Sequence, residues 1–254
     1  MNDDLDLALE CARRAALVIS GAAVTPARFK GEVDPVTVTD QAAESAVREL
    51  LGTARPSDAV LGEEEGGADW RTGRVWILDP LDGTVNFIHR VPHVAVSIAL
   101  WEDGRPVVGV VHDVGRDEVF SAVRGRGATL DKRPIHVTDT ADLGSALVAT
   151  GFPYDRRSKA AELGETVGRV LAAVQGIRRF GSAALDLCWV AAGRYDAYWE
   201  YRLQPWDTAA GELIVDEAGG RVTDLTGAPY RPDAAGILAS NGPLHDRLRK
   251  VIVP

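Results

Sequence analysis

The sequence predicts a mixed α/β protein in which helices pack against sheets. Three observations point to this class. Apolar residues recur at helical spacing near the N-terminus, β-branched runs separated by Gly and Asp fill the middle, and strands and helices alternate after about residue 143. The 254 residues, 46% of them hydrophobic, are enough to bury a substantial core. We expect an N-terminal half over residues 1–142 and a C-terminal half over residues 143–254, with a cleft between them.

The N-terminal half begins with two predicted helices. Asp3 or Asp4 can cap the first. Its apolar residues recur near helical spacing at Leu7, Cys11, Ala15 and Ile19. A second helix is expected from about Asp40 to Leu51, ending before Gly52.

The rest of this half is predicted to form a mostly antiparallel sheet, because it consists of β-branched runs with turn residues between them. The expected strands are 75–78, 93–100, 106–114 and 118–123. Residues 128–137 then have the pattern of a hairpin that turns at Asp131 and Lys132.

The C-terminal half is predicted to alternate between strands and helices. Expected strands are 146–150, 177–180 and 196–200, with short ones near Val222 and Ile237. Expected helices are about 159–175, 183–192 and 208–218, and a last one after Pro243. Gly219 and Gly220 are suited to end the third of these helices.

The composition argues against several classes of protein. A net charge of −9 is unfavourable for a nucleic-acid binder, which relies on basic side chains. Because Cys11 and Cys188 are the only cysteines, we expect buried thiols in a reducing compartment. The acidic N-terminus lacks the layout of a signal peptide, and no apolar run approaches the roughly 18 residues of a membrane span. The sequence thus predicts a cytoplasmic protein that binds neither nucleic acid nor membrane.

The most informative segment is 75–84, where a strand of buried character runs into Asp79. Pro80 forces an extended or turn conformation, and Asp82 follows. Two carboxylates from one rigid turn can converge on cations, and the Leu81 carbonyl between them is a further hard oxygen ligand, the type that Mg²⁺ prefers. The alternative is that the Asp-Gly pair forms a tight turn and nothing more. The presence of Asp79, Pro80 and Thr84 around this pair favours the metal site.

Three further carboxylates stand at the ends of strands or the starts of helices. Glu63, the first of three glutamates after an apolar run, is placed as Asp79 is, and it could bind a metal and polarise an attacking water. Glu65 is interpreted as part of a solvated loop. Asp40 and Asp207 stand at predicted helix starts, where capping is the simpler explanation for each alone. Clustering so many carboxylates is costly unless cations lie between them.

Taken in order along nearly the whole chain, these residues resemble the inositol monophosphatase family. The first signature matches WILDPLDGTVNF at 76–87, and the second matches WDTAAGELIV at 206–215, running into EAGG at 217–220. Further matches in family order are Lys30-Gly31, Asp34, Val36-Thr37, Asp40, Gly62-Glu63-Glu64 and Gly181-Ser182-Ala183. Pro35, where the family commonly has an apolar residue, and the extra Glu65 depart from the pattern, but neither is an expected ligand.

The resemblance implies a layered αβαβα sandwich and a homodimer. It also implies a lithium-sensitive phosphatase that uses two or three Mg²⁺ ions, with Mn²⁺ as a substitute. By analogy, Glu63, Asp79 and the Leu81 carbonyl would hold the first ion, and Glu63 would also reach a third, weaker one. Asp79, Asp82 and Asp207 would hold the second.

The resemblance assigns further roles around these ligands. Thr84, hydrogen-bonded to Asp40, would help Glu63 to orient and deprotonate the attacking water. The main-chain N–H groups of Gly83 and Thr84 would hold the phosphate. The remaining implied substrate contacts are Gly181, Ser182, Ala183, Glu200 and Asp207.

The substrate is open at this point. Inositol monophosphate is the first expectation and histidinol phosphate the second, with fructose 1,6-bisphosphate and 3′-phosphoadenosine nucleotides as further alternatives within the same architecture. No HExxH or G-x-S-x-G motif offers a rival catalytic site. A non-catalytic binding protein is the alternative from another class, because some bacterial relatives contact the transcription machinery.

Overall fold

The computed structural model describes residues 3–22, 28–29 and 35–253. Three of the residues matched to the family in the sequence, Lys30, Gly31 and Asp34, lie outside the described residues.

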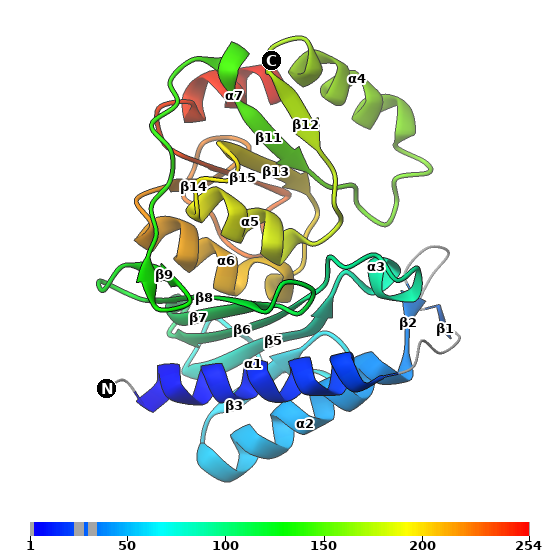
Figure 1. Cartoon of the computed structure of the whole chain (residues 1–254), viewed down its shortest axis with the longest axis vertical. Coiled ribbons are helices and arrows are strands. Elements are labelled where there is room, and N and C mark those ends of the chain that lie inside the picture. The colour runs from blue at the N-terminus through cyan, green and yellow to red at the C-terminus, as the bar shows by residue number, and fades with distance from the viewer. Residues whose placement is uncertain (1–2, 23–27, 30–34, 254) are drawn as a thin grey trace.

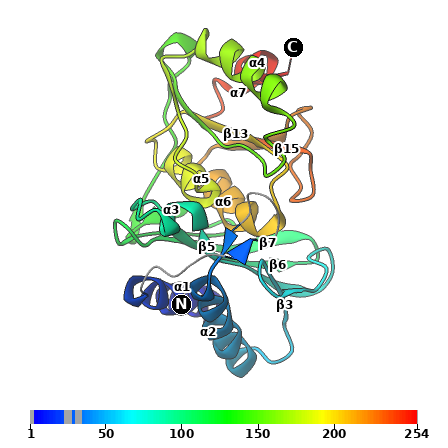
Figure 2. The same ribbon diagram turned by 90° about the vertical axis from the view of Figure 1, so that its right-hand side faces the viewer.

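The described chain forms five layers, helix–sheet–helix–sheet–helix, which run from bottom to top in Figure 1 and are seen from the side in Figure 2. The outer layer at the bottom is α1 (Asp3–Gly21) and α2 (Val38–Ala54), the middle layer is α5 (Ala183–Ala191) and α6 (Pro205–Glu217), and the layer at the top is α4 (Ala160–Leu171) and α7 (His245–Ile252). The predicted αβαβα sandwich is therefore confirmed.

The lower sheet has eight strands in the order β10-β9-β8-β7-β6-β5-β3-β4. Their bounds are β3 (Ala59–Gly62), β4 (Gly66–Gly67), β5 (Arg74–Asp82), β6 (Ala95–Glu102), β7 (Arg105–Asp113), β8 (Glu118–Val123), β9 (Ala128–Leu130) and β10 (Arg133–Pro134). Every pairing is antiparallel except that of β3 with β5. The hairpin of β9 and β10 turns at Asp131 and Lys132, whose φ angles are 48° and 66°, the two left-handed residues of a tight hairpin turn. This prediction is also confirmed.

The upper sheet has five strands in the order β12-β11-β13-β15-β14. Their bounds are β11 (Leu147–Thr150), β12 (Gly176–Arg178), β13 (Ala197–Tyr201), β14 (Arg221–Asp224) and β15 (Gly236–Ser240). β11 runs parallel to both its neighbours, and the remaining pairs are antiparallel. The shorter elements are β1 (Arg28–Phe29), β2 (Pro35–Val36), α3 (Thr84–Ile88) and the 3₁₀ helix η1 (Leu143–Ser145).

Three predicted helix bounds were wrong. α2 does not stop before Gly52 but continues to Ala54, because one glycine costs a helix only about 1 kcal/mol and buried Leu51 anchors this turn. α6 begins at Pro205, three residues early, since proline is well tolerated in the first turn. α4 ends at Leu171, after which the chain turns into β12.

The apolar core lies in three clusters: one between the lower sheet and α1/α2, one around α5 and α6 between the two sheets, and one between the upper sheet and α4/α7. In β5, Val75 and Ile77 face α5 and α6, whereas Trp76 and Leu78 face α1 and α2, so this run is apolar throughout because both its faces are buried. Helices of the second half thus pack directly on the sheet of the first, and the predicted boundary at 142/143 falls in the connection between the two sheets.

Both cysteines are buried free thiols, as predicted. In the described part of the chain, no helix is both long and apolar enough to cross a membrane.

Candidate active site

A β-bulge at the end of β5 turns two aspartates to the same face of the sheet. Asp79 pairs with Ser97 and Asp82 with Ala95, so three steps along β5 match two along β6. In a regular strand, residues three apart point to opposite faces, and one extra residue reverses this. Leu81 accordingly joins the core on the α1/α2 side, while Asp79 and Asp82 line a pocket on the other side.

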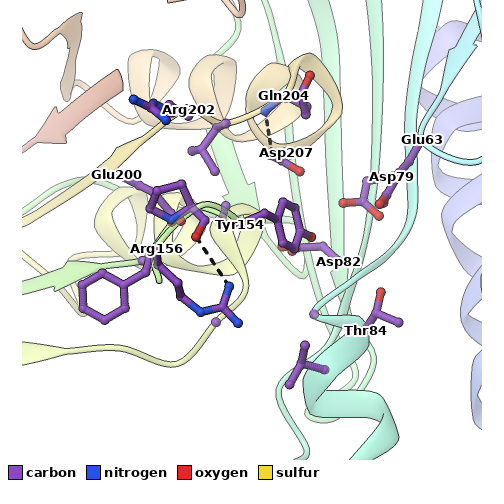
Figure 3. A pocket seen from close by; sticks show the side chains of 18 of the residues that line it. Glu63, Asp79, Asp82, Thr84, Tyr154, Arg156, Glu200, Arg202, Gln204 and Asp207 are labelled. Atoms are coloured by element: carbon purple, nitrogen blue, oxygen red, sulfur yellow. Dashed lines mark hydrogen bonds between the residues drawn. The ribbon is translucent and has the colours of Figure 1, made fainter. Parts of the chain in front are cut away.

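Glu63 reaches the same pocket from the neighbouring strand. β3 runs parallel to β5 with Gly62 opposite Leu78, so Glu63 and Asp79 follow the last paired residues of two adjacent strands. The N–H of Glu63 donates to the Leu78 carbonyl at 3.2 Å. Figure 3 shows the two side chains next to each other at one end of the pocket.

Asp40 and Thr84 form a second pair beside Glu63. The Thr84 hydroxyl donates to Asp40 Oδ1 at 2.9 Å and lies 3.2 Å from the Leu81 carbonyl. Asp40 Oδ2 accepts from the N–H of Thr37 at 2.8 Å, closing a capping box at the start of α2. Asp40 is thus a capping residue, as its position in the sequence suggested, and its other oxygen holds Thr84.

Gly83 precedes α3 with φ of 95°, a conformation that favours glycine. A Cβ here would also lie 3.0 Å from the His93 carbonyl. The Asn86 amide donates to the carbonyls of His93 and Phe180, both at 2.8 Å. The turn at the end of β5 is therefore fixed against the second half of the chain.

Asp82 and Asp207 join the two halves at the pocket. Asp82 Oδ2 accepts from the Ser182 hydroxyl at 2.5 Å and from the Ala184 N–H at 2.8 Å, both at the start of α5. Asp207 lies in the first turn of α6, where its Oδ2 accepts from the Gln204 N–H at 2.7 Å. In both aspartates these bonds are accepted by Oδ2.

Of the twelve residues that the sequence analysis assigned to the site, ten line one pocket, and Figure 3 shows most of them. These are Glu63, Asp79, Leu81, Asp82, Gly83, Thr84, Gly181, Ala183, Glu200 and Asp207. The other two, Asp40 and Ser182, are buried behind the wall and bond to Thr84 and Asp82, respectively. We call Glu63, Asp79, Asp82 and Asp207 the carboxylate wall.

The side chains of the carboxylate wall repel one another. Burial raises the pKa of Asp79 well above its usual value, and the charges of Glu63, Asp82 and Asp207 raise it further. Burial also raises the pKa of Asp207, with the charges of Asp82 and Glu63 next in importance. The pKa of Asp82 is raised to about 6 by burial, although the bonds from Ser182 and Ala184 oppose the shift. Each carboxylate therefore lies within the field of the others.

This donor set fits hard divalent cations. Four carboxylates and the Leu81 carbonyl supply the oxygen ligands that Mg²⁺ prefers, and a cation among them would relieve their repulsion. Within residues 3–22, 28–29 and 35–253, no three Asp, Glu, His or Cys side chains already converge closely enough to enclose a single ion. Binding of one ion by three of these carboxylates therefore requires side-chain adjustment.

Glu200 lines the pocket away from Glu63 and Asp79 (Figure 3). The Tyr198 hydroxyl donates to its Oε2 at 2.6 Å, and a Cβ at Gly151 would lie 1.8 Å from the same oxygen, so Gly151 makes room for this carboxylate. Burial raises the pKa of Glu200 to about 7. At neutral pH this carboxyl can therefore donate or accept a hydrogen bond.

The side of the pocket that carries basic residues was missed in the sequence. Arg156, Arg179 and Arg202 line it together with exposed Tyr154, and we call these three arginines the arginine rim. Figure 3 shows Arg156 and Arg202 across the pocket from Glu63 and Asp79. Arg202 is paired with Asp155, and the Arg156 guanidinium lies 3.5 Å from the Pro153 carbonyl. The segment 151–154, which lines the pocket beside these arginines, was likewise assigned no role from the sequence.

A five-layered αβαβα sandwich with a carboxylate-lined pocket at the bulged end of a central strand defines the sugar-phosphatase class of folds. Comparison with known proteins identifies the family within this class. The inositol monophosphatase family matches residues 2–253, so the chain belongs to that family.

Individual relatives agree with this assignment. The Nus factor SuhB of Escherichia coli (strain K12) is 42% identical over 246 residues, covering 95% of this chain and 92% of that protein. An inositol-1-monophosphatase of Rhizobium meliloti (strain 1021) is 43% identical, covering 88% of this chain and 85% of the relative. The solved inositol monophosphatase from Anabaena (Nostoc) sp. PCC 7120 is 40% identical with a TM-score of 0.88, covering 98% of this chain and 95% of that chain.

Proposed function

We propose that this chain is a Mg²⁺-dependent phosphatase that hydrolyses a small sugar or polyol phosphate monoester, with inositol monophosphate first and histidinol phosphate second among the candidates. One observation carries the proposal: a single pocket combines the carboxylate wall with the hydrogen-bonded pair of Thr84 and Asp40. The inositol-1-monophosphatase relative supports the same reaction class. We further propose that the protein is a cytoplasmic homodimer.

Our proposal for the metal assigns Glu63, Asp79, the Leu81 carbonyl, Asp82 and Asp207 as its ligands. Bound Mg²⁺ would offset the charge of these groups, polarise the phosphoryl oxygens and lower the pKa of water at the site.

Glu63 and Thr84 are proposed to prepare the attacking water. Asp40 accepts the Thr84 hydroxyl proton at 2.9 Å, so the Thr84 oxygen keeps its lone pairs for a water in the pocket. The Glu63 carboxylate takes a proton from that water as its oxygen attacks phosphorus. The P–O bond to the alcohol breaks on the opposite side, and the released alkoxide takes up a proton.

The rest of the pocket is proposed to hold the substrate. The main-chain N–H groups of Gly83 and Thr84 would bind phosphate oxygens at the start of α3. Glu200 would bind a hydroxyl of the alcohol, for which a carboxyl with pKa of about 7 can act as donor or acceptor. Gly181 and Ala183 line the same pocket and are proposed to contact the alcohol as well. Ser182 contributes indirectly, through its bond to Asp82.

The test is a phosphate-release assay of the purified chain with Mg²⁺, Mn²⁺ or EDTA. The esters are inositol 1-phosphate, histidinol phosphate, fructose 1,6-bisphosphate and a 3′-phosphoadenosine nucleotide. We expect Mg²⁺-dependent release that lithium inhibits, with inositol 1-phosphate giving the highest kcat/KM. A different preferred ester would revise the substrate alone, and no release from any ester would overturn the proposal.

A non-catalytic binding role is the second candidate, because the Escherichia coli relative is named a Nus factor. Absence of phosphate release together with intact Mn²⁺ binding and co-purification of a large partner would favour it. Phosphate release with a turnover typical of an enzyme would favour the phosphatase over the non-catalytic role.

A further inference from the structure

Glu44 is a buried carboxylate that the mechanism above does not use. It lies on α2 one turn after Asp40, and its side chain is fully buried. Residues four apart on a helix share one face. α2 therefore presents two carboxylates in succession toward the end of the sheet where the pocket lies.

Glu44 binds the turn that carries Glu63. Its Oε2 accepts from the N–H of Glu64 at 2.8 Å, and its Oε1 accepts from the N–H of Glu65 at 3.2 Å. Oε1 also accepts from Arg48 Nε at 2.7 Å. Both main-chain amides that follow Glu63 are thus bonded to one buried side chain.

Two neighbouring features are shaped around this contact. A Cβ at Gly62 would lie 2.2 Å from Glu44 Oε1, so glycine lets β3 end directly against the carboxylate. Arg48, whose charge balances Glu44, donates through Nη2 to the Gly66 carbonyl at 2.7 Å. The turn between β3 and β4 is therefore held at both its start and its end by α2.

We propose that Glu44 is a positioning residue, which fixes the Glu63 turn so that the Glu63 carboxylate faces Asp79 in the pocket. Asp40 holds Thr84 and Glu44 holds the Glu63 turn, so one rigid helix aligns both groups that act on the water. This inference rests on the proposed role of Glu63. A carboxylate is required because both its oxygens accept from main-chain N–H groups, whereas an amide would turn its own NH₂ toward one of those donors.

The test compares Glu44→Gln with Glu49→Gln, which makes the same change at an exposed carboxylate on the same helix. Three quantities are measured: hydrogen exchange of the amides of residues 64 and 65, the Kd for Mn²⁺ by calorimetry, and steady-state kinetics with Mg²⁺. In Glu44→Gln we expect faster exchange in the turn, a Kd about 10–100-fold higher, and a matching fall in kcat with KM near the wild-type value. Glu49→Gln should resemble wild type in all three.

A double-mutant cycle with Glu63→Gln separates positioning from general stabilisation. If Glu44 acts through Glu63, adding Glu44→Gln to Glu63→Gln should weaken Mn²⁺ binding little further, and full additivity would overturn the proposal. Unchanged Mn²⁺ affinity and unchanged exchange in folded Glu44→Gln would overturn it as well.

Gly62→Ala breaks the same contact while keeping both carboxylates, because its Cβ forces the Glu44 side chain to move. Gly62→Ala therefore tests the proposal even if Glu44→Gln does not fold. Mn²⁺ binding by Gly62→Ala should be weaker than that of wild type, and unchanged binding would contradict the proposal. Mn²⁺ binding and exchange do not depend on turnover. If the wild-type chain has no phosphatase activity, the proposed function is overturned, but the effect of Glu44 on the Glu63 turn and on Mn²⁺ binding can still be measured.

Discussion

The carboxylate wall and the arginine rim line the same pocket, but the structure holds them in different ways. Asp79, Asp82 and Asp207 each have one oxygen bonded to nearby main-chain N–H groups, and they stand on a central strand or in the first turn of a helix. In contrast, Arg156 and Arg202 belong to connecting segments, and their guanidinium groups contact a carbonyl at 3.5 Å and a loop aspartate, respectively.

This difference separates two tasks. Groups that act on the phosphate need fixed geometry, which strands, helix starts and buried hydrogen bonds provide. Groups that select the rest of the ester need only complementary charge and shape, and loop residues can supply these. We therefore expect substitutions in the carboxylate wall to change turnover and metal binding, and substitutions in the arginine rim to change substrate preference.

The largest effect is expected from Asp82→Asn. The amide keeps the size of the side chain, and its carbonyl oxygen can still accept from Ser182 and Ala184, but it removes a charge and puts an NH₂ group in place of Oδ1 among the proposed metal ligands. We expect kcat/KM for phosphate release to fall by about 1000-fold or more and Mn²⁺ binding to weaken in calorimetry. Asp6→Asn, on the exposed face of α1, is the matched control. Normal activity in purified Asp82→Asn would refute the role of this residue.

Glu200 lines the same pocket away from Glu63 and Asp79, and the effect of replacing it should appear in stability. Its carboxyl has a pKa of about 7 in the folded chain against 4.5 ordinarily, so the unfolded chain loses this proton first as pH rises. Wild type should therefore lose stability between about pH 4.5 and 7, by on the order of 3 kcal/mol. Glu200→Gln has no ionisable group at this position and should not show this loss of stability.

Chemical unfolding of both proteins in EDTA, from pH 5 to 8, tests this effect. The advantage in unfolding free energy of Glu200→Gln over wild type should grow as pH rises. Glu49→Gln shows how much of the trend comes from removing a surface charge. A difference that stays constant with pH would contradict the raised pKa.

A smaller effect is expected from Thr84→Ala, which removes the hydroxyl bonded to Asp40 but no proposed metal ligand. kcat should fall by about 10–100-fold while the Kd for Mn²⁺ stays near wild type. Thr84→Ser keeps the hydroxyl and should recover most of the activity. If Thr84→Ala turns over as wild type does, the water is not oriented by this pair.

The same contrast explains which features the sequence could predict. Asp79, Asp82 and Glu63 were found because an apolar run that ends in an acidic residue is a local pattern. The bulge that turns Asp79 and Asp82 to one face was not predicted, because it depends on pairing with β6. Likewise, Ser182 was expected at the substrate, yet it lies 100 residues from Asp82 in sequence and bonds to it. Such a contact depends on how the halves pack.

The arginine rim had no comparable signal. Arginines are usually found at the protein surface, and nothing local distinguishes Arg156, which lines the pocket, from Arg157 beside it. Glu44 was likewise indistinguishable from the other charged residues of its helix until the fold showed it buried against the Glu63 turn.

The smallest effect is expected from Arg156→Gln. Its partly exposed guanidinium can attract a second anionic group at the far end of the substrate, and such a contact contributes about 0.5–1 kcal/mol. The kcat/KM for fructose 1,6-bisphosphate should fall about two- to fivefold, and the fall should shrink at high salt. With inositol 1-phosphate, which has no second phosphate, kcat/KM should hardly change, and Arg157→Gln should leave both esters unaffected. A similar loss of kcat for both esters would place Arg156 with the catalytic groups, and the two sides of the pocket would then not divide catalysis from selection.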